Sequence, residues 1–222
     1  MQKPDAKEAA PIMQRGIKAL LAAVPTSGRT GADFRTACGS LIANAAALIQ
    51  SDAAGPPLIE CFDLARQAGA TQAQLASVRN ETIAETPVTV GATMIRDSIV
   101  QTCLSAEGYV IAATSFTSRE DVDALREEMN NVFASVEESA ADAMDQMTFR
   151  AVIQLHSAVV FFLVQTARPL PRMVSFAFAT SMPTLRMAQR LYADGGRADE
   201  LREENKVVHP AFAPATGKAL SQ

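Results

Sequence analysis

The stretch that decides the fold is the end of the chain, residues 172–222: RMVSFAFATSMPTLRMAQRLYADGGRADELREENKVVHPAFAPATGKALSQ. Pro183 suits the first turn of a helix, where its missing N–H is not needed. Apolar residues then recur at helical spacing and predict one inward-facing stripe, made of Leu185, Ala188, Leu191 and Tyr192. Gly195 and Gly196 are expected to end this helix, because glycine adopts positive φ at little steric cost.

A second short helix is predicted over residues 197–206, with Ala198, Leu201 and Val207 turned inward. Turn-forming residues follow and lead to a short strand over residues 218–221. Before the first helix, Val174, Phe176 and Phe178 alternate with small residues, which is typical of a strand. This strand is expected to pair either with residues 218–221 or with a neighbouring subunit. The predicted order is strand, helix, helix, strand (βααβ).

This arrangement resembles the LysM module, a small α+β fold of βααβ order. The residues that carry the resemblance are expected to be structural or to contact a partner; they are Thr184, Leu185, Leu191, Tyr192, Asp194, Glu200, Leu201, Asn205, His209, Pro210 and Phe212. The resemblance implies a compact domain over residues 168–222 that follows a proline-stiffened linker.

The same region is more closely similar to the C-terminus of the DNA circularisation proteins of Mu-like phages, which are tail proteins. The similar segments are residues 168–172 (RPLPR), 190–192 (RLY), 197–201 (RADEL) and 209–212 (HPAF). The resemblance fades into general helical similarity back to about Thr86. Members of that family are longer and begin with a β-rich domain, for which this sequence has no counterpart.

The family resemblance implies a structural virion protein of a contractile phage-type tail, an adaptor between the tail tube and the baseplate hub. Its expected partners are the tube and hub proteins and further copies of itself, arranged as a ring of six. The expected location is the virion tail, after synthesis in the bacterial cytoplasm. Two other functions stay open: a DNA-end-holding circularisation protein delivered with the genome, and a peptidoglycan-binding LysM protein.

Residues 1–167 are predicted to form a helical bundle, so the fold class is mainly α with a small α+β domain. Residues 1–15 are expected to be a loose arm that is at most partly helical, followed by a short helix over residues 17–24 and a loop over residues 25–31. Further helices are expected over residues 34–50, 56–68, 71–85 and 88–112, with a close helix crossing at Gly108. Asp33 and Ser118 are the predicted N-caps. An apolar helical period runs from residue 118 to residue 165, with a kink near Gln146.

Composition argues against several functions. The net charge of −4 gives no bulk attraction to nucleic acid, so direct binding to DNA is not expected. The cysteines Cys38, Cys61 and Cys103 are far apart and read as buried thiols rather than metal ligands. No phosphate-binding glycine loop or nucleophile motif occurs. We therefore expect no catalytic residues, no cofactor and no metal.

The most apolar run, residues 151–164, is too short to span a bilayer. It is predicted to be a buried helix in which His156 is a satisfied core histidine, and no contact with a membrane is expected. His209, which precedes Pro210, is expected to be a turn or packing residue.

Overall fold

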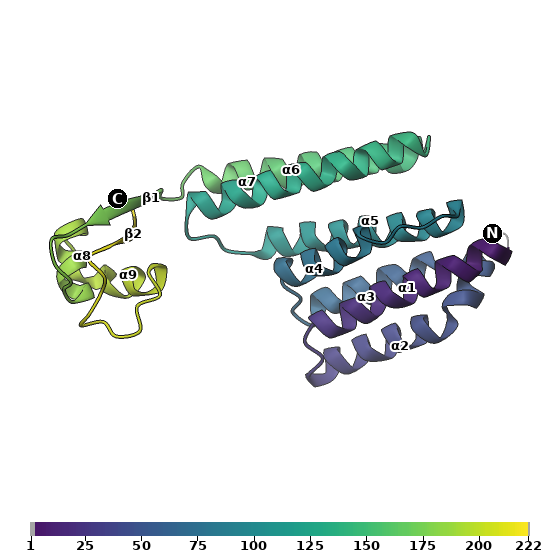
Figure 1. Cartoon of the computed structure of the whole chain (residues 1–222), viewed down its shortest axis with the longest axis horizontal. Helices are drawn as coiled ribbons and strands as arrows, with labels where there is room; N and C mark the ends of the chain where they lie inside the picture. The colour runs from purple at the N-terminus through teal and green to yellow at the C-terminus, as the bar shows by residue number, and fades with distance from the viewer. Residues whose placement is uncertain (1–2, 222) are drawn as a thin grey trace. The chain divides into compact units, whose positions relative to one another are not determined.

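The computed structural model describes residues 3–221. The protein is mainly helical, with one two-stranded antiparallel sheet near the C-terminus (Figure 1). It divides into two compact units: the helical unit, residues 1–114 and 132–159, and the C-terminal unit, residues 115–131 and 160–222. Two helices, α6 (Arg119–Asp142) and α7 (Gln146–Ala167), contribute residues to both units. A domain boundary between residues 167 and 168 stays a prediction.

Five helices carry the core of the helical unit: α1 (Lys3–Ala23), α2 (Gly28–Gln50), α3 (Gly55–Gln67), α4 (Gln72–Ile83) and α5 (Val90–Ala113). Helix α1 packs against α2, α4 and α5, while α3 packs against α2 and α5. Most of the buried apolar residues of these five helices form one contiguous cluster. Because each helix buries one stripe of its surface, this cluster is the main hydrophobic contribution to the stability of the unit.

Two of the predicted helix starts are built on side-chain caps. Thr71 precedes α4 and accepts a hydrogen bond from the N–H of Gln74, whose side chain accepts one from the N–H of Thr71. Ser118 precedes α6 and accepts from the N–H of Asp121, while its hydroxyl donates to the Asp121 carboxylate. Both pairs satisfy backbone groups that a helix terminus otherwise leaves without partners.

The prediction of a loose N-terminal arm is wrong for the described part of residues 1–15; Met1 and Gln2 lie outside the described residues. Helix α1 begins at Lys3 and contains Pro11. Its inward residues recur every three or four positions and are buried: Ala6, Ala9, Ala10, Ile12, Met13, Ile17 and Leu20. This burial offsets the backbone hydrogen bond that Pro11 cannot make.

The predicted N-cap Asp33 lies inside α2, because the helix starts five residues earlier, after Ser27. The segment from Pro25 to Gly31 was expected to be a loop. Gly31 explains the difference, since a side chain there would overlap the backbone of Thr26. Because Gly31 has no side chain, the backbone of Thr26 packs directly against the first turn of α2.

The long apolar period from residue 118 to residue 165 is not one helix. It turns back after Asp142, where Met144 adopts a positive φ of 54°, and α6 and α7 lie as a hairpin (Figure 1). The Asp145 carboxylate accepts hydrogen bonds from the N–H groups of Met147 and Thr148, and so caps α7. The predicted kink near Gln146 is therefore a full turn.

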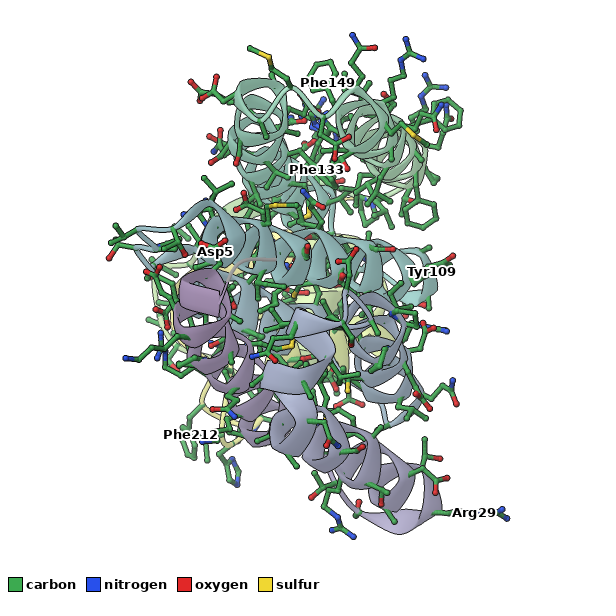
Figure 2. All side chains as sticks on the ribbon, turned by 90° about the vertical axis from the view of Figure 1, so that its right-hand side faces the viewer. Asp5, Arg29, Tyr109, Phe133, Phe149 and Phe212 are labelled. Atoms are coloured by element: carbon green, nitrogen blue, oxygen red, sulfur yellow. The ribbon has the colours of Figure 1, made fainter. Side chains whose placement is uncertain are left out.

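Within the helical unit, the hairpin approaches α5. A side chain at Gly108 would lie against Leu155 and Val159, which confirms Gly108 as a point of close helix contact. The Glu137 carboxylate accepts a hydrogen bond from Nδ1 of His156 at 2.8 Å, and the His156 ring stacks on Phe133 (labelled in Figure 2), with 4.8 Å between ring centroids. His156 therefore has a hydrogen-bond partner, as predicted, but it is only partly buried and is not a core residue.

The prediction that residues 151–164 form a buried helix is wrong. They belong to α7, whose 22 residues include a single Lys, Arg, Asp or Glu residue, Arg150. Only 17% of the most apolar 18-residue stretch of α7 is buried, and the side chains of Met147 and Phe161 are largely exposed. By length and composition alone, α7 is the one helix among residues 3–221 that is apolar enough to cross a membrane.

A buried ion pair in the helical unit has no signal in the sequence. Arg79 of α4 donates to the carboxylate of Glu107 of α5 at 2.7 and 2.9 Å, and both side chains are fully buried. Cys103 lies beside the pair, and burial raises the pKa of its thiol. All three cysteines are free and buried, which confirms their interpretation as core thiols.

The C-terminal unit contains β1 (Met173–Ala177), α8 (Thr184–Tyr192), a short 3-10 helix η1 (Gly195–Arg197), α9 (Ala198–Glu204) and β2 (Thr216–Leu220). The helix ends differently from the prediction. Ala193 adopts the left-handed conformation with a φ of 57°, and neither Gly195 nor Gly196 has a positive φ. The two glycines instead form η1, because Asp194 caps the N–H of Gly196.

Candidate interaction site in the C-terminal unit

Strands β1 and β2 pair antiparallel, with Phe176 opposite Gly217 and Val174 opposite Ala219. The N–H of Phe178 donates to Ala215, and the N–H of Ser221 donates to Arg172. Alternate residues of β1 therefore bond to β2, and the residues between them, Met173, Ser175 and Ala177, direct their backbone groups to the other side. The predicted pairing of these two segments is confirmed.

Asn205 closes the free edge of β2. Its carboxamide oxygen accepts from the N–H of Lys218 at 2.8 Å, and its nitrogen donates to the carbonyl of Lys218 at 2.7 Å. The side chain thus makes the two hydrogen bonds that a third strand would make. Gly217 is needed beside it, because a methyl group there would overlap Asn205 and the ring of Phe176.

Tyr192 anchors the core of the unit and is nearly buried. The guanidinium of Arg197 lies 3.8 Å from the centroid of its ring, and Glu200 holds that guanidinium through two hydrogen bonds of 2.7 and 3.0 Å. Burial, together with the negative charge of Glu200, raises the pKa of Tyr192 to about 12. Burial and Glu200 therefore favour the neutral phenol, and they outweigh the positive charge of Arg197, which lowers the pKa of Tyr192. Arg197 supplies a cation–π contact that sequence reasoning missed.

Three further predicted site residues have structural roles. The N–H of Thr184 donates to the carbonyl of Pro210 at 2.7 Å, which ties the loop after α9 to the start of α8. Leu201 is buried in the core, and Leu191 is half-buried against it. The fully buried residues of α8 that complete this core are Met187 and Ala188.

The remaining predicted site residues are on the surface. Leu185 is 63% exposed, so its prediction as an inward residue is wrong; the inward face is set by Thr184, Met187 and Ala188. His209 and Pro210 are exposed, and Phe212, labelled in Figure 2, is 76% exposed. The rings of His209 and Phe212 contact each other, with 5.5 Å between centroids, and Val208 is 99% exposed. We call Val208, His209 and Phe212 the loop patch.

The loop patch is chemically distinct from the rest of the predicted site. The exposed apolar side chains of Val208 and Phe212 in one short loop leave water only when another surface covers them. The sequence placed His209 and Phe212 in the candidate site but not Val208. The adjacent valines indicated this exposed position in the sequence. Val207 packs against the core, and the neighbouring Val208 is left exposed.

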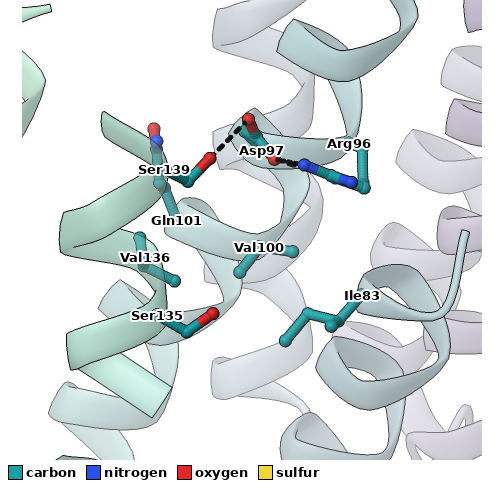
Figure 3. Close-up of a pocket in the computed structure, with 8 residues that line it drawn as sticks. All are labelled: Ile83, Arg96, Asp97, Val100, Gln101, Ser135, Val136 and Ser139. Carbon is teal, nitrogen blue, oxygen red and sulfur yellow. Dashed lines mark hydrogen bonds and ion pairs between the residues drawn. The ribbon is translucent and has the colours of Figure 1, made fainter. Parts of the chain in front are cut away.

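A small cavity of about 140 Å³ lies in the helical unit and is lined by residues of α4, α5 and α6: Ile83, Arg96, Asp97, Val100, Gln101, Ser135, Val136 and Ser139 (Figure 3). Asp97 accepts hydrogen bonds from Arg96 at 2.8 Å and from the Ser139 hydroxyl at 3.2 Å. The polar groups thus bond to one another, and the volume is below that of typical small-molecule sites.

Within residues 3–221, no three or more His, Cys, Asp or Glu side chains lie together in a group that would hold a metal ion. No protein-family model matches the chain, and no curated protein matches it.

Proposed function

We propose that this protein is a structural component of a contractile phage-type tail, an adaptor between the tail tube and the baseplate hub that acts as several copies. The observation that carries the proposal is the division of the C-terminal unit into a structural set of residues and an exposed apolar loop patch. The structural set, with Tyr192, Leu201 and Asn205, supports a rigid LysM-like module. The patch supports contact with a protein neighbour, because exposed apolar groups are typical of surfaces that become buried on assembly.

Helix α7, which contributes residues to both units, adds a second reason. Helix α7 is long, nearly uncharged and largely exposed, which fits a surface that is covered by other subunits. A ring of copies joined head to tail is the natural assembly for an adaptor around a tail axis. The resemblance to DNA circularisation proteins of Mu-like phages supports the tail as the location.

Peptide mass spectrometry of purified tail particles from a strain that encodes this chain tests the proposal. The expected result is that the chain is present in a fixed ratio to the tube and hub proteins. Its absence from intact particles would overturn the proposal.

A DNA-end-holding function is the second candidate, because residues 168–222 contain eight Lys or Arg and five Asp or Glu residues. Two of those cations, Arg197 and Arg202, face acidic partners at 2.7 and 3.7 Å, which lowers the charge available to phosphate. Filter binding of duplex DNA at low and physiological salt separates the two functions. Tight binding with a steep salt dependence favours the DNA function. Retention on purified cell wall would instead favour peptidoglycan binding.

A further inference from the structure

The two edges of the small sheet are finished differently. The free edge of β2 is closed by the Asn205 carboxamide, as described above. The free edge of β1 begins with Met173, whose N–H donates to the carboxylate of Glu120 at 2.7 Å. Among the described residues, none bonds to the outward N–H and C=O groups of Ser175 and Ala177. Two consecutive outward positions of β1 are therefore left open.

Nothing in β1 protects this open edge. Exposed edge strands are normally blunted by charged side chains, proline or bulges. Residues 173–177 contain neither a charged residue nor proline, and the pairing with β2 is regular. Ser175 and Ala177 are small and exposed, so another backbone can approach them closely. Beside them, Val174 leaves an apolar side chain 45% exposed.

We propose that the open edge of β1 pairs with β1 of a second copy of this chain, antiparallel about a two-fold axis at Phe176. In this register Ser175 lies opposite Ala177 of the other copy, and the two residues exchange two backbone hydrogen bonds. The symmetry repeats the pair, which gives four hydrogen bonds and one continuous four-stranded sheet. The Glu120–Met173 hydrogen bond is kept, because Met173 lies beyond the paired residues.

The side chains suit this self-pairing. Phe176 meets its own copy at a non-hydrogen-bonded position, where side chains approach most closely and aromatic pairs are favourable. The paired segment carries no charge, so two identical copies approach without repulsion. A strand with acidic or basic residues would have no complementary partner on this edge. The contact is independent of the tail function proposed above, because it joins two copies whatever larger assembly they enter.

Cysteine cross-linking of the full chain tests both the contact and its register. We expect the double variant Ser175→Cys/Ala177→Cys to form a disulfide-linked dimer under copper–phenanthroline oxidation in native buffer. The matched controls are the two single variants, which place a cysteine opposite serine or alanine and should stay unlinked. The three natural cysteines are buried and do not compete.

Sedimentation of unmodified and variant chains gives the second measurement. Ser175→Pro removes an outward N–H and should lower the affinity of the two-fold contact at least tenfold, whereas Ser175→Ala keeps the backbone donor and should dimerise as the unmodified chain does. Limited proteolysis confirms that each variant keeps a folded C-terminal unit. The proposal is overturned if the double cysteine variant does not cross-link, if Ser175→Cys alone does, or if folded Ser175→Pro dimerises normally.

Discussion

The helical unit buries apolar stripes from five helices in one core and encloses a charged pair within it. The C-terminal unit has a smaller apolar cluster, which includes the buried side chains of Met187, Tyr192 and Leu201, and it closes its sheet with the side chain of Asn205. A small unit buries a smaller share of its surface and depends more on each contact. We therefore expect that breaking the buried charged pair destabilises the helical unit as a whole. Removing one buried apolar side chain should instead unfold the C-terminal unit alone.

The largest expected effect comes from breaking the Arg79–Glu107 pair. Arg79→Leu leaves the Glu107 carboxylate buried without its cation and should cost about 3–5 kcal/mol of the free energy of unfolding of the helical unit. The double variant Arg79→Leu/Glu107→Leu removes both charges and should recover most of that loss. Urea denaturation of the three proteins measures both values. A single variant as stable as the unmodified chain would contradict the burial of the pair.

Leu201→Ala tests the small core of the C-terminal unit. Removing a fully buried leucine should cost about 2–5 kcal/mol, which is comparable with the whole stability of a unit of this size. Limited proteolysis should then cleave the chain after residue 172 while the helical unit stays intact. Leu185→Ala is the matched control, because Leu185 is exposed and its loss should leave the protease resistance unchanged.

Asn205→Ala removes the closure of β2. Two backbone groups of Lys218 then lose their partners, but they lie at the surface and water can replace the side chain in part. We expect a loss of about 1–2 kcal/mol in the C-terminal unit, measured by thermal unfolding. Asn205→Asp is an informative comparison, since it keeps the acceptor for the Lys218 N–H and loses the donor to the Lys218 carbonyl. Equal losses of stability in Asn205→Ala and Asn205→Asp would indicate that the hydrogen bond from the Asn205 nitrogen to the Lys218 carbonyl supplies most of the stabilisation.

The smallest effect is the titration of Tyr192. In Tyr109→Phe, Tyr192 is the single tyrosine, and its phenolate absorbance should appear with a midpoint near 12 rather than near 10. Because the folded pKa lies above the unfolded one, the contribution of Tyr192 to the stability of the C-terminal unit is fully present below pH 10 and is lost as the pH rises through 12. A midpoint near 10 would mean that Tyr192 is open to water.

The sequence predicted those features that depend on local chemistry. The cap at Ser118, the helix start at residue 71 and the strand around Phe176 follow from residues within a few positions of each other. The first part of helix α1 was missed because prolines and charges near its start outweighed a regular series of small apolar residues. The Arg79–Glu107 pair was missed because its members are 28 residues apart and meet only through the packing of α4 on α5.

The candidate site was predicted as a set of residues but not as two sets with different roles. Leu185 fitted the helical period of the predicted stripe, yet α8 faces the core with Thr184, Met187 and Ala188. A short helix has too few turns for the period to fix which side is inward. Leu185, His209 and Phe212 are exposed, while Tyr192, Leu201 and Asn205 hold the unit together. Burial separates these roles, and spacing alone does not.

The division of the candidate site into a structural set and an exposed loop patch is tested most directly by incorporation of variants into tail particles. The double variant Val208→Ser/Phe212→Ser changes only exposed side chains of the patch, so the C-terminal unit should stay as resistant to protease as in the unmodified chain. We predict that particles assembled with this variant contain much less of the chain, while Leu185→Ser, a matched exposed change outside the patch, is incorporated normally. Incorporation of the folded double variant at the level of the unmodified chain would contradict the assignment of the loop patch as the contact surface.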